Sequence, residues 1–248
     1  MSDLGSDPEP DIASADAARS RSFASAPSRS RPIPGTLRAM LDFAGVHVLA
    51  DDDPRWKHDP VAQARAACAG GARAVQLRAK RATDAQALAW GRELRALTRA
   101  AGVVFVVNDR VDLALASEAD AVHLGQDDLA PADARRIAPR LAIGRSTHDA
   151  AQLARALTEP IDYVAYGPLF GTASKDTGYD ARGLAALREI ASHCAPLPLV
   201  AIGGIDETNC AQARAAGALG IAVISAVANA ADPVAAARAL VAAFGGAR

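Results

Sequence analysis

The chain alternates short apolar runs with segments of helical periodicity, and this alternation constrains its fold more than any other feature. The apolar runs lack the polar alternation of half-exposed strands, which is typical of parallel strands buried on both faces. The predicted strands cover residues 46–50, 74–79, 103–108, 121–124, 141–145, 162–166, 199–203 and 221–225. The predicted helices cover residues 60–69, 84–101, 131–139, 149–157, 182–193, 206–216 and 233–244.

Strands that alternate with helices eight times predict a closed (β/α)8 TIM barrel rather than an open doubly wound sheet. A barrel of about 250 residues fits a chain of 248 residues. The segment after Arg110 is short for a crossover helix. We therefore predict a single α/β domain over residues 36–248, in which a short helix at residues 36–43 precedes the first strand.

The first 35 residues are rich in Ser, Ala, Pro and charged side chains and contain hardly any large apolar residue. Such a segment cannot bury enough surface to offset the entropy lost on ordering, so residues 1–35 are predicted to be a disordered extension. Its Arg/Ser-rich half resembles a transit peptide, but the acidic residues that precede it argue against that interpretation.

Composition excludes some classes of function. A net charge of −1 argues against a general nucleic-acid-binding surface. No apolar run approaches the roughly 20 residues that span a membrane. Three widely spaced cysteines, Cys68, Cys194 and Cys210, are odd in number, so we expect reduced, structural thiols and a cytoplasmic location.

Polar residues gather where the predicted strands end, and barrels place their active sites at these carboxyl ends. In chain order they are Gln76, Arg78 and Lys80; Asn108 and Asp109; His123, Gln126 and Asp128; Ser146, Thr147 and His148; residues 167–175; Gly203 and Gly204; and Ile224, Ser225 and Ala226. The sequence therefore predicts a strongly cationic site with two carboxylates and glycine-rich late loops.

Three cations, Arg78, Lys80 and Lys175, are expected to converge at this end, which suits a polyanion such as diphosphate. Strand period places Gln76 and Arg78 on the same face, toward the barrel interior or its rim. Burying them is costly unless they bind something. The alternative is a structural ion pair inside the barrel.

Two aspartates, Asp109 and Asp128, could share one Mg²⁺ with diphosphate oxygens and water, because Mg²⁺ commonly uses only one or two protein carboxylates. The alternative is that each caps the following helix. Gly203 and Gly204 let the main chain approach a phosphate, unless they serve turn geometry alone. His123 and His148 are candidates for a base or for packing between strands and helices.

The motifs QLRAK, ND, HLGQDD, a Ser after GR, GPLFGTASK, IGGI and VIS occur in the order and spacing of the thiamine phosphate synthase family. The resemblance covers residues from about 45 to 244. It implies a TIM-barrel transferase that joins 4-amino-2-methyl-5-(diphosphooxymethyl)pyrimidine to thiazole phosphate, giving thiamine phosphate and diphosphate with Mg²⁺ as cofactor. It also implies a dissociative reaction, in which diphosphate leaves before the thiazole nitrogen attacks.

The same resemblance implies residue roles. The pyrimidine diphosphate would be held by Gln76, Leu77, Arg78, Ala79, Lys80, Asn108, Ser146 and Lys175, of which Arg78, Lys80, Ser146 and Lys175 would be catalytic. The thiazole phosphate would be held by Thr172, Ala173, Ser174, Gly204, Ile224 and Ser225, and Mg²⁺ by Asp109 and Asp128. Ser174 stands where the family often has threonine, and it keeps the hydroxyl.

Other functions stay open on the residues alone. A thiazole tautomerase of similar outline binds no diphosphate, so it has no need of Asp109 and Asp128. A non-catalytic barrel that binds thiamine precursors predicts loss of the metal ligands or of Lys175. An aldolase needs a Schiff-base lysine on an interior strand position. The expected partners are two small-molecule substrates, without nucleic acid or membrane, and a homo-oligomer is compatible with the sequence.

Overall fold

A computed structural model describes residue 1 and residues 41–171 and 178–245 of the chain. The predicted extension at residues 1–35, the sequence 36–40 and the segment that contains Thr172, Ala173, Ser174 and Lys175 lie outside the described residues, apart from Met1. Residues 41–43 belong to the predicted first helix, and there the described backbone is not helical.

Eight parallel strands form a closed barrel in which each strand pairs with the next along the chain and β8 pairs with β1. The strands are β1 (Gly45–Asp51), β2 (Ala74–Arg78), β3 (Val104–Asn108), β4 (Ala121–Leu124), β5 (Ala142–Thr147), β6 (Tyr163–Tyr166), β7 (Leu199–Ile202) and β8 (Gly220–Val223). The predicted TIM barrel is confirmed, because each strand overlaps the run that predicted it.

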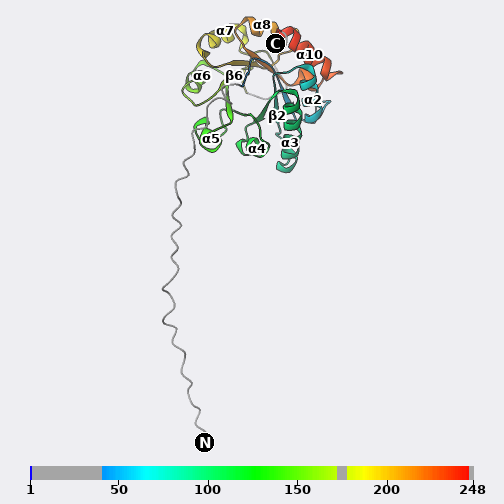
Figure 1. Cartoon of the computed structure of the whole chain (residues 1–248). Coiled ribbons are helices and arrows are strands. Elements are labelled where there is room, and N and C mark those ends of the chain that lie inside the picture. The colour runs from blue at the N-terminus through cyan, green and yellow to red at the C-terminus, as the bar shows by residue number, and fades with distance from the viewer. Residues whose placement is uncertain (2–40, 172–177, 246–248) are drawn as a thin grey trace. The chain divides into compact units, whose positions relative to one another are not determined.

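Helices surround the ring of strands, as Figure 1 shows. They are α2 (Pro60–Gly70), α3 (Asp84–Ala101), α4 (Val111–Ala116), α5 (Pro131–Ile137), α6 (Ala150–Ala156), α7 (Gly183–Cys194), α8 (Cys210–Ala215), α9 (Ser225–Ala228) and α10 (Pro233–Phe244). The crossover after Arg110 is α4, and the short α9 was not predicted. Helix α8 begins later than residue 206, because Asp206 accepts hydrogen bonds from the backbone and hydroxyl of Thr208 in a turn.

Capping residues explain where several helices begin and end. Asp149 and Asp232 cap α6 and α10 by accepting backbone N–H groups of the first turn. Thr83 caps α3, so that Asp84 is the first helical residue. Gly71 and Gly102 end α2 and α3 in the left-handed conformation, which glycine adopts without a steric cost.

Two apolar layers result from the pleat of the strands. The interior layer contains Phe43, Leu49 and Val106, and Phe43 stacks on Tyr163 with ring centroids 4.3 Å apart. The outer layer packs strand residues such as Val75 against alanine-rich helices. The three cysteines are free thiols within the outer region, and burial raises the pKa values of Cys68 and Cys194 to about 11.

A partly buried carboxylate stabilises the amino end of β6. Asp162 accepts a hydrogen bond from the backbone N–H of Ile143 on β5 at 2.8 Å and pairs with Arg135 of α5 at 2.7 Å. The same arrangement recurs between β3 and β4. There Asp120 pairs with Arg95 of α3 and accepts a hydrogen bond from the backbone N–H of Phe105. Each carboxylate thus ties a helix to the start of two strands, which is a structural role at the end opposite the predicted site.

The described helices include none that combines the length and apolar character required to cross a membrane.

The substitution Asp162→Ala should lower the free energy of unfolding by about 2 kcal/mol, because it leaves Arg135 and the Ile143 N–H without their carboxylate partner. The matched control is Asp133→Ala on the exposed side of α5, where the ion pair is 3.5 Å long and worth at most about 0.5 kcal/mol. Urea denaturation measures both values. Equal losses in the two variants would contradict the structural role of Asp162.

Candidate active site

A cavity opens at the carboxyl end of the barrel, where the predicted site residues gather. Its lining includes Gln76, His123, His148, Ser146, Gly204, Ile224 and Ser225. The charged residues of β2, β3 and β4 lie beside it, since Arg78 is the next inward-facing position of β2 after Gln76. The predicted residues therefore form two adjoining groups, a partly apolar cavity and a charged cluster.

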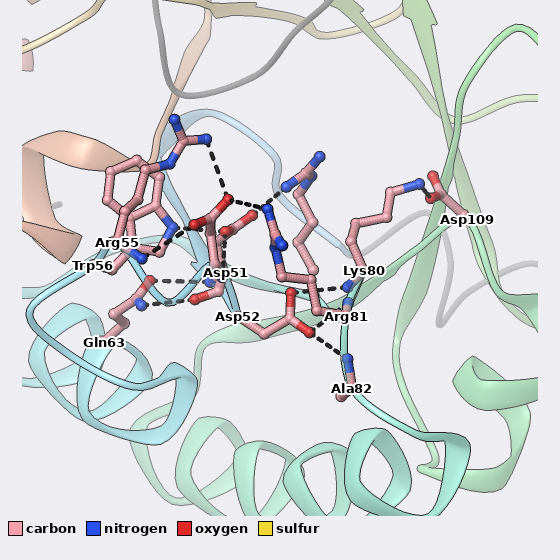
Figure 2. Close-up of polar contacts among 11 residues, drawn as sticks. Asp51, Asp52, Arg55, Trp56, Gln63, Lys80, Arg81, Ala82 and Asp109 are labelled. Atoms are coloured by element: carbon pink, nitrogen blue, oxygen red, sulfur yellow. Dashed lines mark hydrogen bonds and ion pairs between the residues drawn. The ribbon is translucent and has the colours of Figure 1, made fainter.

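Asp51 organises the charged cluster, although the sequence did not predict it. Its side chain is 0% exposed and forms an ion pair with Arg78, which lies opposite it in the β1–β2 register. The indole N–H of Trp56 donates to the same carboxylate at 2.6 Å, and the backbone N–H of Asp53 donates at 3.0 Å. Gln63 of α2 bonds both the N–H and the carbonyl of Asp51 (Figure 2). The ion pair foreseen as the alternative for Arg78 is thus present.

Asp52 holds the loop that follows β2. Its carboxylate accepts backbone N–H groups from Lys80 at 2.9 Å, Arg81 at 2.8 Å and Ala82 at 2.8 Å. With its backbone fixed in this way, Lys80 extends its side chain to Asp109, with which it forms an ion pair (Figure 2). Asp51 at the end of β1 and Asp52 directly after it therefore position the two cations of the β2 motif.

Asp109 and Asp128 lie together, as predicted, and neither caps a helix. The N-cap positions of α4 and α5 are Arg110 and Ala130, and neither helix has a side-chain cap. Asp128 instead accepts the N–H of Gly125 at 2.6 Å and is within hydrogen-bonding reach of Asp109. Asp109 has a φ of 64°, an uncommon value for a residue other than glycine.

Like charges perturb this pair. Burial and the neighbouring Asp109 carboxylate raise the pKa of Asp128, whereas the Gly125 N–H and Lys80 act in the opposite direction. Two carboxylates this close favour a shared cation or a shared proton. No group of three or more His, Cys, Asp or Glu side chains meets at one point in residues 41–171 and 178–245. A metal at this place would therefore rely on the two aspartates, with its remaining ligands from substrate or water.

His123 and Ser146 form the floor of the cavity. Nε2 of His123 lies 2.8 Å from Oγ of Ser146, and Nδ1 lies 3.0 Å from the hydroxyl of Tyr163. Gln126 donates to the carbonyl of Ser146 at 2.5 Å, so that both the main chain and the side chain of Ser146 are held. His148 also lines the cavity, stacks on Tyr179 and hydrogen-bonds the carbonyl of Gly167 through Nδ1.

The late loops come close to each other through glycine. Gly203 and Gly204 have φ values of 105° and 63°, and a Cβ on Gly203 would lie 2.6 Å from Cα of Pro168. The N–H of Phe170 donates to the carbonyl of Gly203 at 2.9 Å. The turn geometry foreseen as the alternative is present. Ile224 is buried beside these loops and Ser225 is exposed at the start of α9.

Asn108 is buried at the end of β3, next to Asp109. Leu77 is buried in the outer layer and Ala79 is half-buried, so neither of these side chains faces the cavity.

The sequence pattern did not predict three residues of the site, Asp51, Asp52 and Tyr163. The acidic run 51–53 after a predicted strand was a usable signal for the first two, whereas Tyr163 is indistinguishable in sequence from an ordinary core residue.

Comparisons with known proteins agree on one family. A family model described as thiamine monophosphate synthase matches residues 42–227. A thiamine-phosphate synthase of Methanoregula boonei is 52% identical over 176 residues, 71% of this chain and 81% of that protein. A thiamine-phosphate synthase of Anaeromyxobacter dehalogenans is 50% identical over 187 residues, 75% and 83% of the two chains. The solved thiamine phosphate pyrophosphorylase from Pyrococcus furiosus has a TM-score of 0.75 at 37% identity, covering 84% of this chain and 97% of its own.

The substitution Asp109→Asn should lower the pKa of Asp128, because it removes the adjacent negative charge while the burial of Asp128 remains. A carboxyl whose pKa is raised by folding lowers stability once it ionises, so the variant should also lose less stability as pH rises through the aspartate range. Carbon-13 NMR of side-chain carboxyls against pH measures the shift. Asp127→Asn is the control, because Asp127 is an exposed neighbour. An unchanged pKa of Asp128 in the Asp109→Asn variant would exclude the coupling between the two carboxylates.

Proposed function

The chain belongs to the thiamine monophosphate synthase family and acts as a thiamine-phosphate synthase, and we propose here which of its residues perform that reaction. The observation that carries the proposal is the pair of adjacent carboxylates, Asp109 and Asp128, beside the ammonium group of Lys80. This arrangement suits an anionic leaving group that binds together with a cation. The reaction transfers a pyrimidinylmethyl group to the nitrogen of thiazole phosphate with release of diphosphate.

We place the pyrimidine diphosphate across the charged cluster and the adjoining part of the cavity. Gln76 and Ser146 line the cavity and would contact the pyrimidine end, with Asn108 at the neighbouring strand end. Arg78 and Lys80 lie toward the diphosphate end, each already oriented by a carboxylate. Lys175 shares this role on the strength of the family motif alone, because it lies outside the described residues.

Mg²⁺ fits the residues present. Asp109 and Asp128 are hard oxygen ligands within reach of each other, and the pKa of Asp128 is raised by burial and by the neighbouring Asp109 carboxylate, whose charge a divalent cation would neutralise. When bound, Mg²⁺ would stabilise the charge that develops on the departing diphosphate. The two-carboxylate arrangement also agrees with a metal whose other ligands are diphosphate oxygens and water.

Thiazole phosphate is assigned to the late loops. Gly204, Ile224 and Ser225 line the same cavity as Ser146, which puts the second substrate next to the first. The backbone of Gly204 and the exposed start of α9 would hold the phosphate, as barrels of this type commonly do. Thr172, Ala173 and Ser174 complete this assignment by family resemblance, outside the described residues.

In the proposed mechanism the protein supplies position and charge rather than a nucleophile. The C–O bond to diphosphate breaks, its electron pair leaves with the diphosphate, and Arg78, Lys80 and Lys175 stabilise the anion. The cationic pyrimidine then accepts the electron pair of the thiazole nitrogen, which forms the new C–N bond. The rigid cavity contributes by holding the two substrates in line.

Two observations disfavour the alternative functions. A thiazole tautomerase binds no diphosphate, so it would not require the cluster of Asp109, Asp128 and Lys80. An aldolase would need an accessible, uncharged lysine on an interior strand position, but Lys80 is half-exposed after β2 and ion-paired with Asp109. We infer a cytoplasmic location, to which the three free thiols are suited, and small-molecule partners.

The first test is a coupling assay with the pyrimidine diphosphate and thiazole phosphate, run with Mg²⁺ and again with excess chelator. Product should form only in the presence of the metal. Product formation at full rate in chelator would refute the magnesium assignment, whereas no product from folded protein under either condition would refute the reaction itself.

The substitutions Asp109→Ala and Asp128→Ala should each reduce turnover by about 100-fold or more, because the leaving group loses the metal that stabilises it. Asp109 directly follows β3 and Asp128 lies in the loop after β4, so both are outside the core and thermal unfolding should be nearly unchanged. Asp127→Ala is the matched control, since this residue is exposed and adjacent in sequence. Wild-type turnover and metal dependence in Asp109→Ala would refute its role as a ligand.

Lys175→Ala should lower the rate of the chemical step and the affinity for the pyrimidine diphosphate, because one cation fewer faces the leaving diphosphate. Single-turnover kinetics separates the two effects. An unaltered rate would mean that the 167–175 loop does not contribute its lysine to the site.

A further inference from the structure

A chain of hydrogen bonds leads from the centre of the barrel to its active-site end. The hydroxyl of Tyr163 lies 3.0 Å from Nδ1 of His123, and Nε2 of His123 lies 2.8 Å from Oγ of Ser146. Tyr163 is 1% exposed and His123 is 7% exposed, whereas Ser146 lines the cavity. The chain thus connects a fully buried phenol to a hydroxyl that faces substrate.

The barrel interior is shaped to hold these two rings. A Cβ on Gly144 of β5 would lie 2.1 Å from Cζ of Tyr163 and 2.5 Å from Nδ1 of His123. Phe43 stacks on the Tyr163 ring, at 4.3 Å between centroids. The absence of a side chain at residue 144 therefore leaves the space in which the tyrosine and the histidine meet.

The direction of each hydrogen bond follows from the donor count of Tyr163. A phenol has one proton to donate, and burial raises the pKa of Tyr163 far above its ordinary value, so the group is protonated. Among the described residues, Nδ1 of His123 is the hydrogen-bond partner of this hydroxyl. The nearby ring of His47 directs Nε2 to the carbonyl of Phe43 instead. A buried donor without an acceptor is unfavourable, so Tyr163 donates and Nδ1 accepts.

We propose that Tyr163 and His123 are positioning residues that fix Ser146 as a hydrogen-bond donor to the substrate. Because Nδ1 accepts from Tyr163, the neutral imidazole carries its proton on Nε2 and donates it to Oγ of Ser146. The hydroxyl proton of Ser146 is then directed away from His123, toward the cavity. Its target is an acceptor atom of the pyrimidine diphosphate, an assignment that rests on the proposed function of this site.

The tautomer is tested first, by nitrogen-15 NMR of the substrate-free protein. The chain contains 5 histidines, and the signal that disappears in His123→Gln identifies His123. We expect protonated Nε2 and unprotonated Nδ1 in the wild type, and a mixture of tautomers in Tyr163→Phe. The matched control is Tyr166→Phe on the same strand, because Tyr166 belongs to the outer layer, and it should match the wild type. A proton on Nδ1 in the wild type would overturn the proposal.

Steady-state kinetics then tests the consequence for the reaction. Tyr163→Phe should lower kcat/KM about tenfold, and Tyr166→Phe should leave it unchanged within about twofold. In a Ser146→Ala background, Tyr163→Phe should have no further effect, because it acts through the missing hydroxyl. Additive losses would assign Tyr163 to general packing and overturn the proposal. A wild-type protein with the expected tautomer but without synthase activity would refute the proposed function and leave the hydrogen-bond direction intact.

Discussion

The fully buried carboxylate of Asp51 is the interaction on which the arrangement of the active-site end depends. A buried charge is tolerated only when it is paired and hydrogen-bonded, and Asp51 receives a guanidinium, an indole N–H and a backbone N–H. Satisfying it fixes Arg78 on β2 and holds Trp56, while Gln63 of α2 bonds the backbone N–H and carbonyl of the same residue. The loops after β1 and β2 are therefore held by one another rather than by the barrel alone.

The acidic residues of this barrel divide their roles by position. At the amino ends of the strands, Asp120 and Asp162 tie helices to neighbouring strands and are fully occupied in doing so. At the carboxyl ends, Asp51 and Asp52 orient cations, and Asp109 and Asp128 face each other at an electrostatic cost. Asp109 has a positive φ, and burial and the Asp109 carboxylate raise the pKa of Asp128; strain of this kind gathers where a ligand relieves it.

Local sequence signals predicted the barrel, because apolar runs that end abruptly and helical periodicity are both properties of neighbouring residues. They also predicted that Asp109 and Asp128 lie close together, because adjacent parallel strands end at the same edge of a sheet. The partner of Arg78 did not follow, because it depends on the register that sets Asp51 opposite Arg78. Tyr163 was missed for a related reason: a strand buried on both faces gives no sign of which residues point inward.

In the described part of the site, carboxylates pair with the cations that the sequence predicted, and this pairing bears on substrate binding. Arg78 is paired with Asp51 and Lys80 with Asp109, so the two described cations of this cluster are already compensated. Arg78 can share its planar guanidinium between two anions, but the compact ammonium of Lys80 cannot serve Asp109 and a diphosphate at full strength. A cation that takes over the Asp109 carboxylate would release Lys80 toward the diphosphate. Metal and pyrimidine diphosphate should therefore favour each other's binding, because each removes a cost that the other would otherwise meet alone.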